Sequence, residues 1–182
     1  YRGLAIHFLD RGIRAEETDK VIEACKDADV KIRYEEGVQQ VFLNGTNITG
    51  RLRDEAVGQM TSKCSVIPEV RAKLLDLQRD LARAQDVIMD GRDIGTCVLP
   101  DADVKVYLTA SVETRAKRRY DELTAKGEAC DLDEIARDIK ERDERDMNRE
   151  TAPLRQAEDA VLVDSSDMTI EEVVKEIAGL CR

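Results

Sequence analysis

The chain has 182 residues, with 29 Lys and Arg against 39 Asp and Glu, which gives a net charge of −10. That length suits one domain with its own core, and the acidic balance disfavours duplex nucleic acid as a partner, because phosphate backbones require clustered basic side chains. No apolar run approaches the roughly 18 residues of a membrane-spanning helix, and five cysteines without C-x-x-C spacing are typical of reduced cytoplasmic thiols.

The first half of the chain predicts helices around a small β patch. Strands at 30–34 and 40–43 are separated by a turn at 35–37 and followed by an Asn44-Gly45 turn. Pro68 suits the first position of a helix, whose buried stripe should be Val70, Leu74, Leu77 and Leu81. Two earlier helices are expected at residues 15–28 and 53–63.

The second half predicts strands that alternate with helices. The apolar runs at 86–89, 104–108 and 160–163 are typical of buried parallel strands. Ser111 should cap one helix and Lys126-Gly127 should end it. Two more helices are predicted over residues 131–149 and 169–181. This alternation indicates an α/β fold with a doubly wound parallel sheet, which binds ligands beyond the carboxyl ends of its strands.

Residues 90–96, Asp-Gly-Arg-Asp-Ile-Gly-Thr, directly follow the apolar run 86–89. At a strand's carboxyl end, Asp90 can hold a hydrated Mg²⁺ on a nucleotide, and the glycine lets the backbone approach a substrate. Arg92 and Asp93 then offer a bidentate donor and an acceptor to a planar polar ligand. The alternative is a turn with a local ion pair.

A second charged cluster ends the helix predicted over 131–149. Leu132, Ile135 and Ile139 mark its inward stripe, which then reaches Arg142, Asp146 and Arg149 in steps of three and four. Inward charges need partners, and an anionic ligand would supply one. Alternatively the helix runs into solvent, where such Arg–Asp pairs are common and weak.

Together these motifs resemble bacterial-type cytidylate kinase. The similar stretches cover essentially the whole chain and include residues 41–45, 62–71, 90–96, 101–111, 140–154 and 160–166. The resemblance implies a P-loop nucleoside-monophosphate kinase core, with a parallel sheet, helices on both faces and a small antiparallel β insert. It also implies a monomer that transfers a phosphoryl group from ATP to CMP or dCMP with Mg²⁺.

The same resemblance implies three parts within one kinase domain over residues 1–182. These are the core, a nucleoside-monophosphate-binding insert at about 29–57, and a short lid at about 120–131. No glycine of the chain fits G-x-x-x-x-G-K-[ST], the loop that cradles phosphates. We therefore expect that the chain lacks the family's N-terminal strand and P-loop, and that by itself it shows no appreciable turnover. The alternatives are a nucleotide-binding remnant without that loop and a kinase for another small acceptor.

The matching motifs also carry residue roles. The implied substrate-binding set is Tyr1, Arg2, Ser62, Arg71, Arg92, Asp93, Arg142, Asp146 and Arg149. Within it, Arg2 would hold the CMP phosphate, Arg92 and Asp93 would read cytosine, and Arg142 and Asp146 would read the sugar hydroxyls. Catalytic roles would fall to Asp90, Arg142 and Arg149, with Asp90 also the metal ligand. ATP would contact Arg115 and Arg119, with Arg118 as a competing candidate and a solvated basic face as the alternative.

Overall fold

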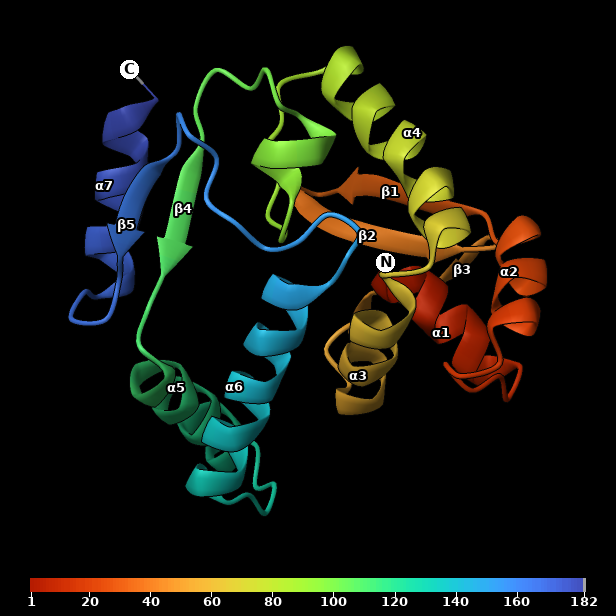
Figure 1. The fold of residues 1–182 in the computed structure, drawn as a ribbon, viewed down its shortest axis with the longest axis horizontal. Helices are drawn as coiled ribbons and strands as arrows, with labels where there is room; N and C mark the ends of the chain where they lie inside the picture. Colours follow the sequence, from red (N-terminus) through yellow and green to blue (C-terminus); the bar gives the residue numbers. More distant parts are fainter. Residues whose placement is uncertain (182) are drawn as a thin grey trace. The chain divides into compact units, whose positions relative to one another are not determined.

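Two separate sheets, one antiparallel and one parallel, organise residues 1–181, which are the residues that the computed structural model describes (Figure 1). The antiparallel sheet lies in a compact unit that ends at Val87, and the parallel sheet lies in a second unit that begins at Ile88. Each unit is described by itself below. The mixed α/β fold class predicted from the sequence is confirmed, including the small antiparallel insert.

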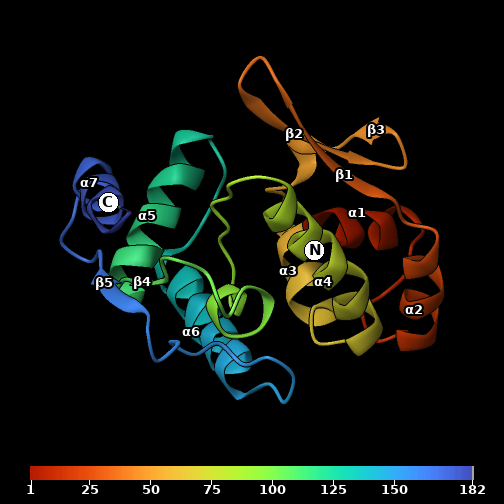
Figure 2. The ribbon, with the colours of Figure 1, turned by 90° about the horizontal axis from the view of Figure 1, so that it is seen from above.

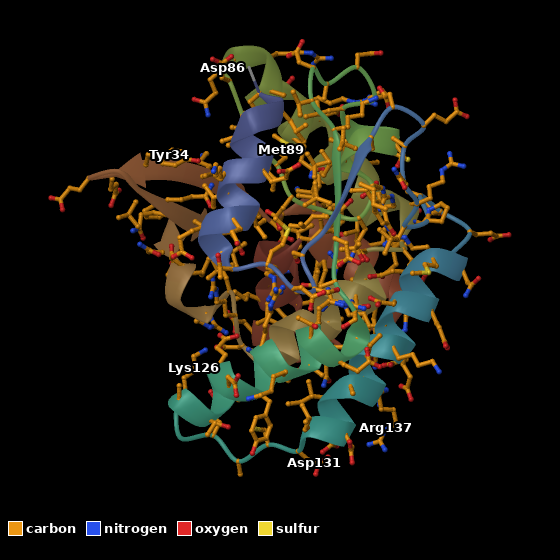
Figure 3. The ribbon with its side chains drawn as sticks, turned by 90° about the vertical axis from the view of Figure 1, so that its left-hand side faces the viewer. Tyr34, Asp86, Met89, Lys126, Asp131 and Arg137 are labelled. Atoms are coloured by element: carbon orange, nitrogen blue, oxygen red, sulfur yellow. The ribbon has the colours of Figure 1, made fainter. Side chains whose placement is uncertain are left out.

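The antiparallel sheet has the order β1-β2-β3, and tight turns set its register. β1 (Val30–Glu35) pairs with β2 (Val38–Leu43), which pairs with β3 (Thr46–Asn47). Both turns place two successive residues at positive φ, Glu36 (52°) with Gly37 (77°) and Asn44 (48°) with Gly45 (82°). Such turns match the twist of a hairpin, so the two turns predicted here are confirmed. Figure 2 shows the β1–β2 hairpin projecting from the helices of its unit, and Figure 3 labels Tyr34 on it.

Four helices cover the rest of this unit and supply most of its core. They are α1 (Arg2–Asp10), α2 (Thr18–Lys26), α3 (Glu55–Cys64) and α4 (Pro68–Ala84), with a 3₁₀ turn, η1 (Thr49–Arg51), before α3. The helix α1 was not predicted, although its Leu4, Ile6 and Phe8 are among the most buried side chains of the chain. The predicted start of α4 at Pro68 is confirmed.

The second unit contains a parallel pair of strands and three α-helices. β4 (Val106–Thr109) pairs with β5 (Val161–Asp164). The helices are α5 (Val112–Ala125), α6 (Leu132–Asn148) and α7 (Ile170–Leu180), and a short π-helical turn, η2 (Ile94–Val98), precedes β4. Helices α5 and α6 pack against each other, and Figure 3 labels Lys126 and Asp131 at the two ends of their connection.

Local capping explains where these helices begin and end. The Ser111 hydroxyl accepts a hydrogen bond from the Thr114 amide (3.1 Å), and the Asp131 carboxylate accepts one from the Glu134 amide (2.8 Å). Gly127, at φ 76°, follows the last turn of α5. A left-handed residue there lets the chain leave the helix without a steric penalty.

The strand predicted at residues 86–89 was wrong. This segment has no regular secondary structure and pairs with neither β4 nor β5, which pair with each other among the described strands. Ile88 is consequently 101 % exposed. An apolar run becomes a strand only when a neighbouring backbone completes its ladder of hydrogen bonds, and no strand in the described chain does so here. Asp90 therefore lies in an irregular, exposed segment and not at the end of a strand.

Candidate functional site

The charged end of α6 turns inward, as the sequence predicted. Ile135 and Ile139 are half-buried, while Leu132 remains 40 % exposed. Three residues before Arg149, the stripe contains Asp146, which is the one buried residue of α6. A carboxylate that is 3 % exposed is costly unless cations neutralise it. The alternative of a helix running into solvent is therefore wrong for this face.

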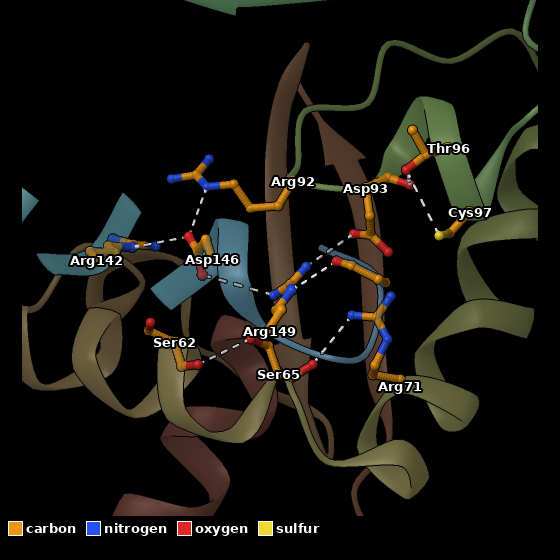
Figure 4. A network of polar contacts seen from close by, with 11 residues as sticks. Ser62, Ser65, Arg71, Arg92, Asp93, Thr96, Cys97, Arg142, Asp146 and Arg149 are labelled. Atoms are coloured by element: carbon orange, nitrogen blue, oxygen red, sulfur yellow. Dashed lines mark hydrogen bonds and ion pairs between the residues drawn. The ribbon is translucent and has the colours of Figure 1, made fainter. Parts of the chain in front are cut away.

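Three guanidinium groups surround Asp146 (Figure 4). Arg92 Nε donates to Asp146 Oδ2 at 3.2 Å. Arg142 Nε lies 3.9 Å from the same oxygen, and Arg149 Nη1 lies 3.9 Å from Asp146 Oδ1. The exposed fractions of the cations differ, at 44 % for Arg92, 37 % for Arg142 and 6 % for Arg149. Arg149 is thus the cation whose partnership with Asp146 is least screened by water.

Asp93 is the second buried carboxylate of this group, at 6 % exposure. Its Oδ1 lies 3.9 Å from Arg149 Nη2, so the Arg149 guanidinium faces both carboxylates. The η2 turn fixes the Asp93 backbone, whose carbonyl accepts hydrogen bonds from the amides of Cys97 (2.9 Å) and Val98 (3.2 Å). A π-helical turn is a rare conformation that often occurs at functional sites. The structure therefore brings together five residues that the sequence assigned to substrate binding: Arg92, Asp93, Arg142, Asp146 and Arg149.

This cluster can recognise a polar ligand through both donors and acceptors. Guanidinium groups donate in a fixed planar arrangement, and carboxylates only accept. A nucleobase edge that carries both kinds of group, or a sugar with vicinal hydroxyls, matches such an array. No side chain of the cluster is a nucleophile, so its chemistry is recognition and charge neutralisation and not covalent catalysis.

The arginines of α5 have protein partners in the structure. Arg115 Nη2 donates to Asp143 Oδ2 on α6 at 2.6 Å, and Arg115 Nε donates to the Ala110 carbonyl at 3.0 Å. Arg118 donates to the Ser165 carbonyl at 2.6 Å and to the Met168 carbonyl at 3.3 Å. These contacts show that Arg115 and Arg118 tie α5 to α6 and to the segment after β5. Whether they also contact ATP stays a prediction.

Arg119 forms a third contact on α5, with Glu122. Arg119 Nη1 donates to Glu122 Oε2 at 3.0 Å, and Lys126 Nζ donates to Glu122 Oε1 at 2.8 Å. Hydrogen bonds from Lys126 and then Arg119 lower the pKa of Glu122 to about 2. This local set of charges is compatible with the solvated basic face that was the alternative for Arg115 and Arg119. The ATP contact of Arg119 is therefore also still a prediction.

The carboxyl ends of β4 and β5 carry a second polar group, centred on Asp164. Ser166 donates to Asp164 Oδ1 through its hydroxyl (2.6 Å) and its amide (2.9 Å), and these bonds lower the pKa of Asp164. The Ser111 amide in turn donates to Ser166 Oγ at 2.8 Å, so the start of α5 is attached to the end of β5. Asp164 is the last residue of β5 and therefore lies at the carboxyl end of that strand.

The predicted substrate residues of the first unit lie in two places. Arg2 Nη1 donates to the Leu52 carbonyl at 2.6 Å, at the start of α1, where Tyr1 is half-buried. Ser62 is buried on α3 and Arg71 lies in the first turns of α4. Ser65 links them, because its hydroxyl donates to the Ser62 carbonyl (3.2 Å) and its own carbonyl accepts from Arg71 Nη1 (3.2 Å). That these residues share one site with the Asp146 cluster stays a prediction.

Sequence reasoning missed Ser65, Asp143 and Ala152 as parts of these polar groups. Of these three, only Asp143 could have been found from the sequence, because it is next to Arg142 in the part of the helix that was already recognised as charged. Ser65 takes part through its backbone carbonyl, and Ala152 has an unusual backbone angle (φ 48°). Neither feature can be predicted from the residue type.

Among residues 1–181, no group of three or more His, Cys, Asp or Glu side chains gathers as a set of metal ligands. No helix in that part of the chain is both long and apolar enough to cross a membrane.

Comparison with known proteins identifies the family of the chain. The family model for cytidylate kinase matches residues 1–182. The chain belongs to the cytidylate kinase family. The cytidylate kinase of Caldicellulosiruptor saccharolyticus is 46 % identical over 180 residues, which cover 99 % of this chain and 80 % of that relative. The cytidylate kinases of Magnetococcus marinus and Corynebacterium efficiens are each 45 % identical, over 99 % of this chain and 80 % and 79 % of their own lengths.

Proposed function

We propose that this protein transfers the terminal phosphoryl group of ATP to CMP or dCMP, which yields CDP or dCDP. Its membership of the cytidylate kinase family supports this activity over the whole chain. The structural observation that carries the proposal is the buried pair Asp93 and Asp146 on either side of the Arg149 guanidinium. Buried charges that are held in this way suit a ligand that is recognised in a site shielded from water.

Cytosine is the part of the acceptor that Arg92 and Asp93 would read. The base offers acceptors at N3 and O2 and a donor at its amino group, and Arg92 with Asp93 supplies the complementary donor and acceptor. A site built to accept a hydrogen bond from the amino group rejects a base that lacks it, because a buried acceptor is then left without a donor. This explains a preference for cytosine over uracil.

The sugar and the phosphate of the acceptor would meet the remaining charges. Arg142 and Asp146 lie four residues apart on α6 and can present a donor and an acceptor to the sugar hydroxyls. Arg149, which is held between two carboxylates, would contact the base or the phosphate. Arg2, Ser62 and Arg71 would bind the monophosphate from the first unit. These roles rest on the motif resemblance and on the side-chain chemistry.

Donor-side chemistry would combine arginine contacts with a divalent cation. The exposed carboxylate of Asp90 is chemically suited to Mg²⁺, which is usually held by one or two carboxylates together with nucleotide phosphates. When bound, Mg²⁺ neutralises charge on the transferring phosphoryl group. Arg115 and Arg119 are proposed to contact ATP, and each would do so while it also contacts its carboxylate partner in the protein, Asp143 or Glu122. A cytoplasmic location and a monomeric state stay predictions.

A substrate panel tests the proposed activity. The complete protein is assayed with ATP, Mg²⁺ and each of CMP, dCMP, UMP, AMP and GMP, and phosphorylated products are separated by chromatography. We expect kcat/KM for CMP or dCMP to exceed that for UMP by a factor of 100 or more, on the order of the discrimination that unpaired buried polar groups produce. Equal rates with all five acceptors would refute the assignment of Arg92 and Asp93 to cytosine.

A further inference from the structure

The segment after α6 folds back sharply onto the end of that helix. The Leu154 amide donates to the Asp146 carbonyl at 2.8 Å, which closes a turn over residues 149–154. Inside this turn, Ala152 adopts φ 48°, in the left-handed region that residues with a Cβ avoid. Strained backbone of this kind persists only where the surroundings determine it, and it gathers at functional sites.

The strained residue makes one specific contact with the charged cluster. The Ala152 carbonyl accepts a hydrogen bond from Arg149 Nε at 2.8 Å. The two terminal nitrogens of the same guanidinium point elsewhere, with Nη1 3.9 Å from Asp146 and Nη2 3.9 Å from Asp93. All three nitrogens of this side chain, which is 6 % exposed, therefore face acceptors in three different segments of the second unit.

We propose that Ala152 is a positioning residue, whose left-handed backbone aims its carbonyl at Arg149 Nε and so sets the direction of the Arg149 guanidinium toward Asp93 and Asp146. An arginine side chain has several rotatable bonds, and a hydrogen bond at Nε fixes the plane of its guanidinium. Groups that are fixed before the ligand arrives lose less freedom on binding. The inference deepens the proposed function, on which it rests, because it gives Arg149 its orientation in the acceptor site.

Substitutions at Ala152 can separate backbone geometry from side-chain size. Ala152→Gly and Ala152→Asn both tolerate positive φ, and we expect each to keep kcat/KM for CMP within about threefold. Ala152→Val does not tolerate it, so the turn should rearrange and kcat/KM for CMP should fall at least about tenfold, as small misplacements of binding groups do. The KM for ATP should stay within about twofold. If the Val variant does not fold, Ala152→Leu is the less strained substitute with the same expected direction.

Gly12→Val is the matched control for strain alone. Gly12 lies in the loop after α1 at φ 66°, and an added Cβ there would meet no atom within 4 Å. The same β-branched residue at the same kind of backbone angle should lower the melting temperature without changing kcat/KM for CMP. If Ala152→Val loses stability as Gly12→Val does, and keeps full kcat/KM for CMP, the positioning role is refuted.

A second measurement does not depend on activity. The Nε–H signal of Arg149 can be assigned in ¹⁵N spectra by its loss in Arg149→Lys, and its hydrogen exchange with solvent can then be timed. We expect slow exchange in the wild type and in Ala152→Asn, and fast exchange in Ala152→Val. If the wild type does not phosphorylate CMP, the proposed function is wrong. The same exchange pattern would still support the hydrogen bond by which the Ala152 carbonyl orients Arg149. Fast exchange in the wild type would overturn the inference whatever the activity.

Discussion

Replacing Asp146 by Asn tests whether the buried carboxylate neutralises the arginines around it. The substitution preserves the size of the side chain and removes its negative charge. Asp146 is 3 % exposed and lies within 4 Å of nitrogens of Arg92, Arg142 and Arg149. Because a buried cation without its partner is strongly unfavourable, we expect both stability and substrate use to fall.

The expected loss of stability comes mainly from one of the three pairs. Two unit charges at 3.9 Å attract by about 4 kcal/mol at an effective dielectric constant of about 20, before the cost of desolvation. Arg92 and Arg142 are 44 % and 37 % exposed, so water screens them and each contributes less than about 1 kcal/mol. Arg149 is 6 % exposed, and the substitution removes the charge of one of the two buried carboxylates that its guanidinium faces. We therefore expect Asp146→Asn to lower the free energy of unfolding by about 3 kcal/mol.

Urea unfolding measures this change directly. With a slope of about 2 kcal/mol/M, the midpoint should fall by roughly 1.5 M. Asp138→Asn is the matched control, because Asp138 lies two turns earlier on the exposed face of α6. That variant should stay within about 0.5 kcal/mol of the wild type. Identical midpoints for the two variants would mean that Asp146 does not neutralise Arg149, and the electrostatic reasoning would be wrong.

Three further changes probe other parts of the structure. Asp143→Asn removes the charge that pairs with Arg115, a side chain that is 34 % exposed, and should lower the free energy of unfolding by no more than about 1 kcal/mol. A larger decrease, measured by urea unfolding, would show that water does not screen this ion pair. Burial raises the pKa of Cys64 to about 11, so at pH 8 iodoacetamide should modify exposed Cys181 and spare Cys64, which peptide mass mapping checks. Ser166→Ala removes the hydroxyl that most lowers the pKa of Asp164, so the pKa measured by ¹³C titration of that carboxylate should rise. In the wild type, the stability that this hydrogen bond gives is present at neutral pH and is lost as the pH falls through the lowered pKa. An unchanged titration would show that the Ser166 hydroxyl does not lower the pKa.

Signals that act within a few residues allowed much of the fold to be predicted. Ser111 caps α5, Asp131 caps α6, and Pro68 opens α4, because each satisfies or avoids backbone donors in its own first turn. The inward charged stripe of α6 was readable for the same reason, since helical spacing places Arg142 and Asp146 on one face. Local signals of this kind therefore predicted several of the helices and the part of the charged cluster that lies on α6.

Features that depend on distant backbone could not be predicted in this way. Residues 86–89 have a strand-like composition, but strand formation needs a neighbouring ladder that is absent from the described chain. α1 was missed because its apolar residues, from Leu4 to Phe8, are buried nearly all round and so show no polar face. The Arg149–Ala152 contact depends on the positive φ of Ala152, and it could not be predicted because alanine rarely adopts that angle.

The Asp146 cluster also limits how an anionic nucleotide can gain affinity there. The Arg149 guanidinium already faces two buried carboxylates, so a phosphate that approaches it gains only the difference between its own attraction and theirs. The net charge of −10 adds no long-range attraction for an anion. Affinity at this cluster must therefore come from matched hydrogen bonds more than from charge. A cytosine edge, which offers donors and acceptors together, is suited to such an array, whereas an inorganic anion of equal charge is not. This is the physical reason to expect that the cluster selects the base and the sugar, and that the phosphates are held mainly by other residues.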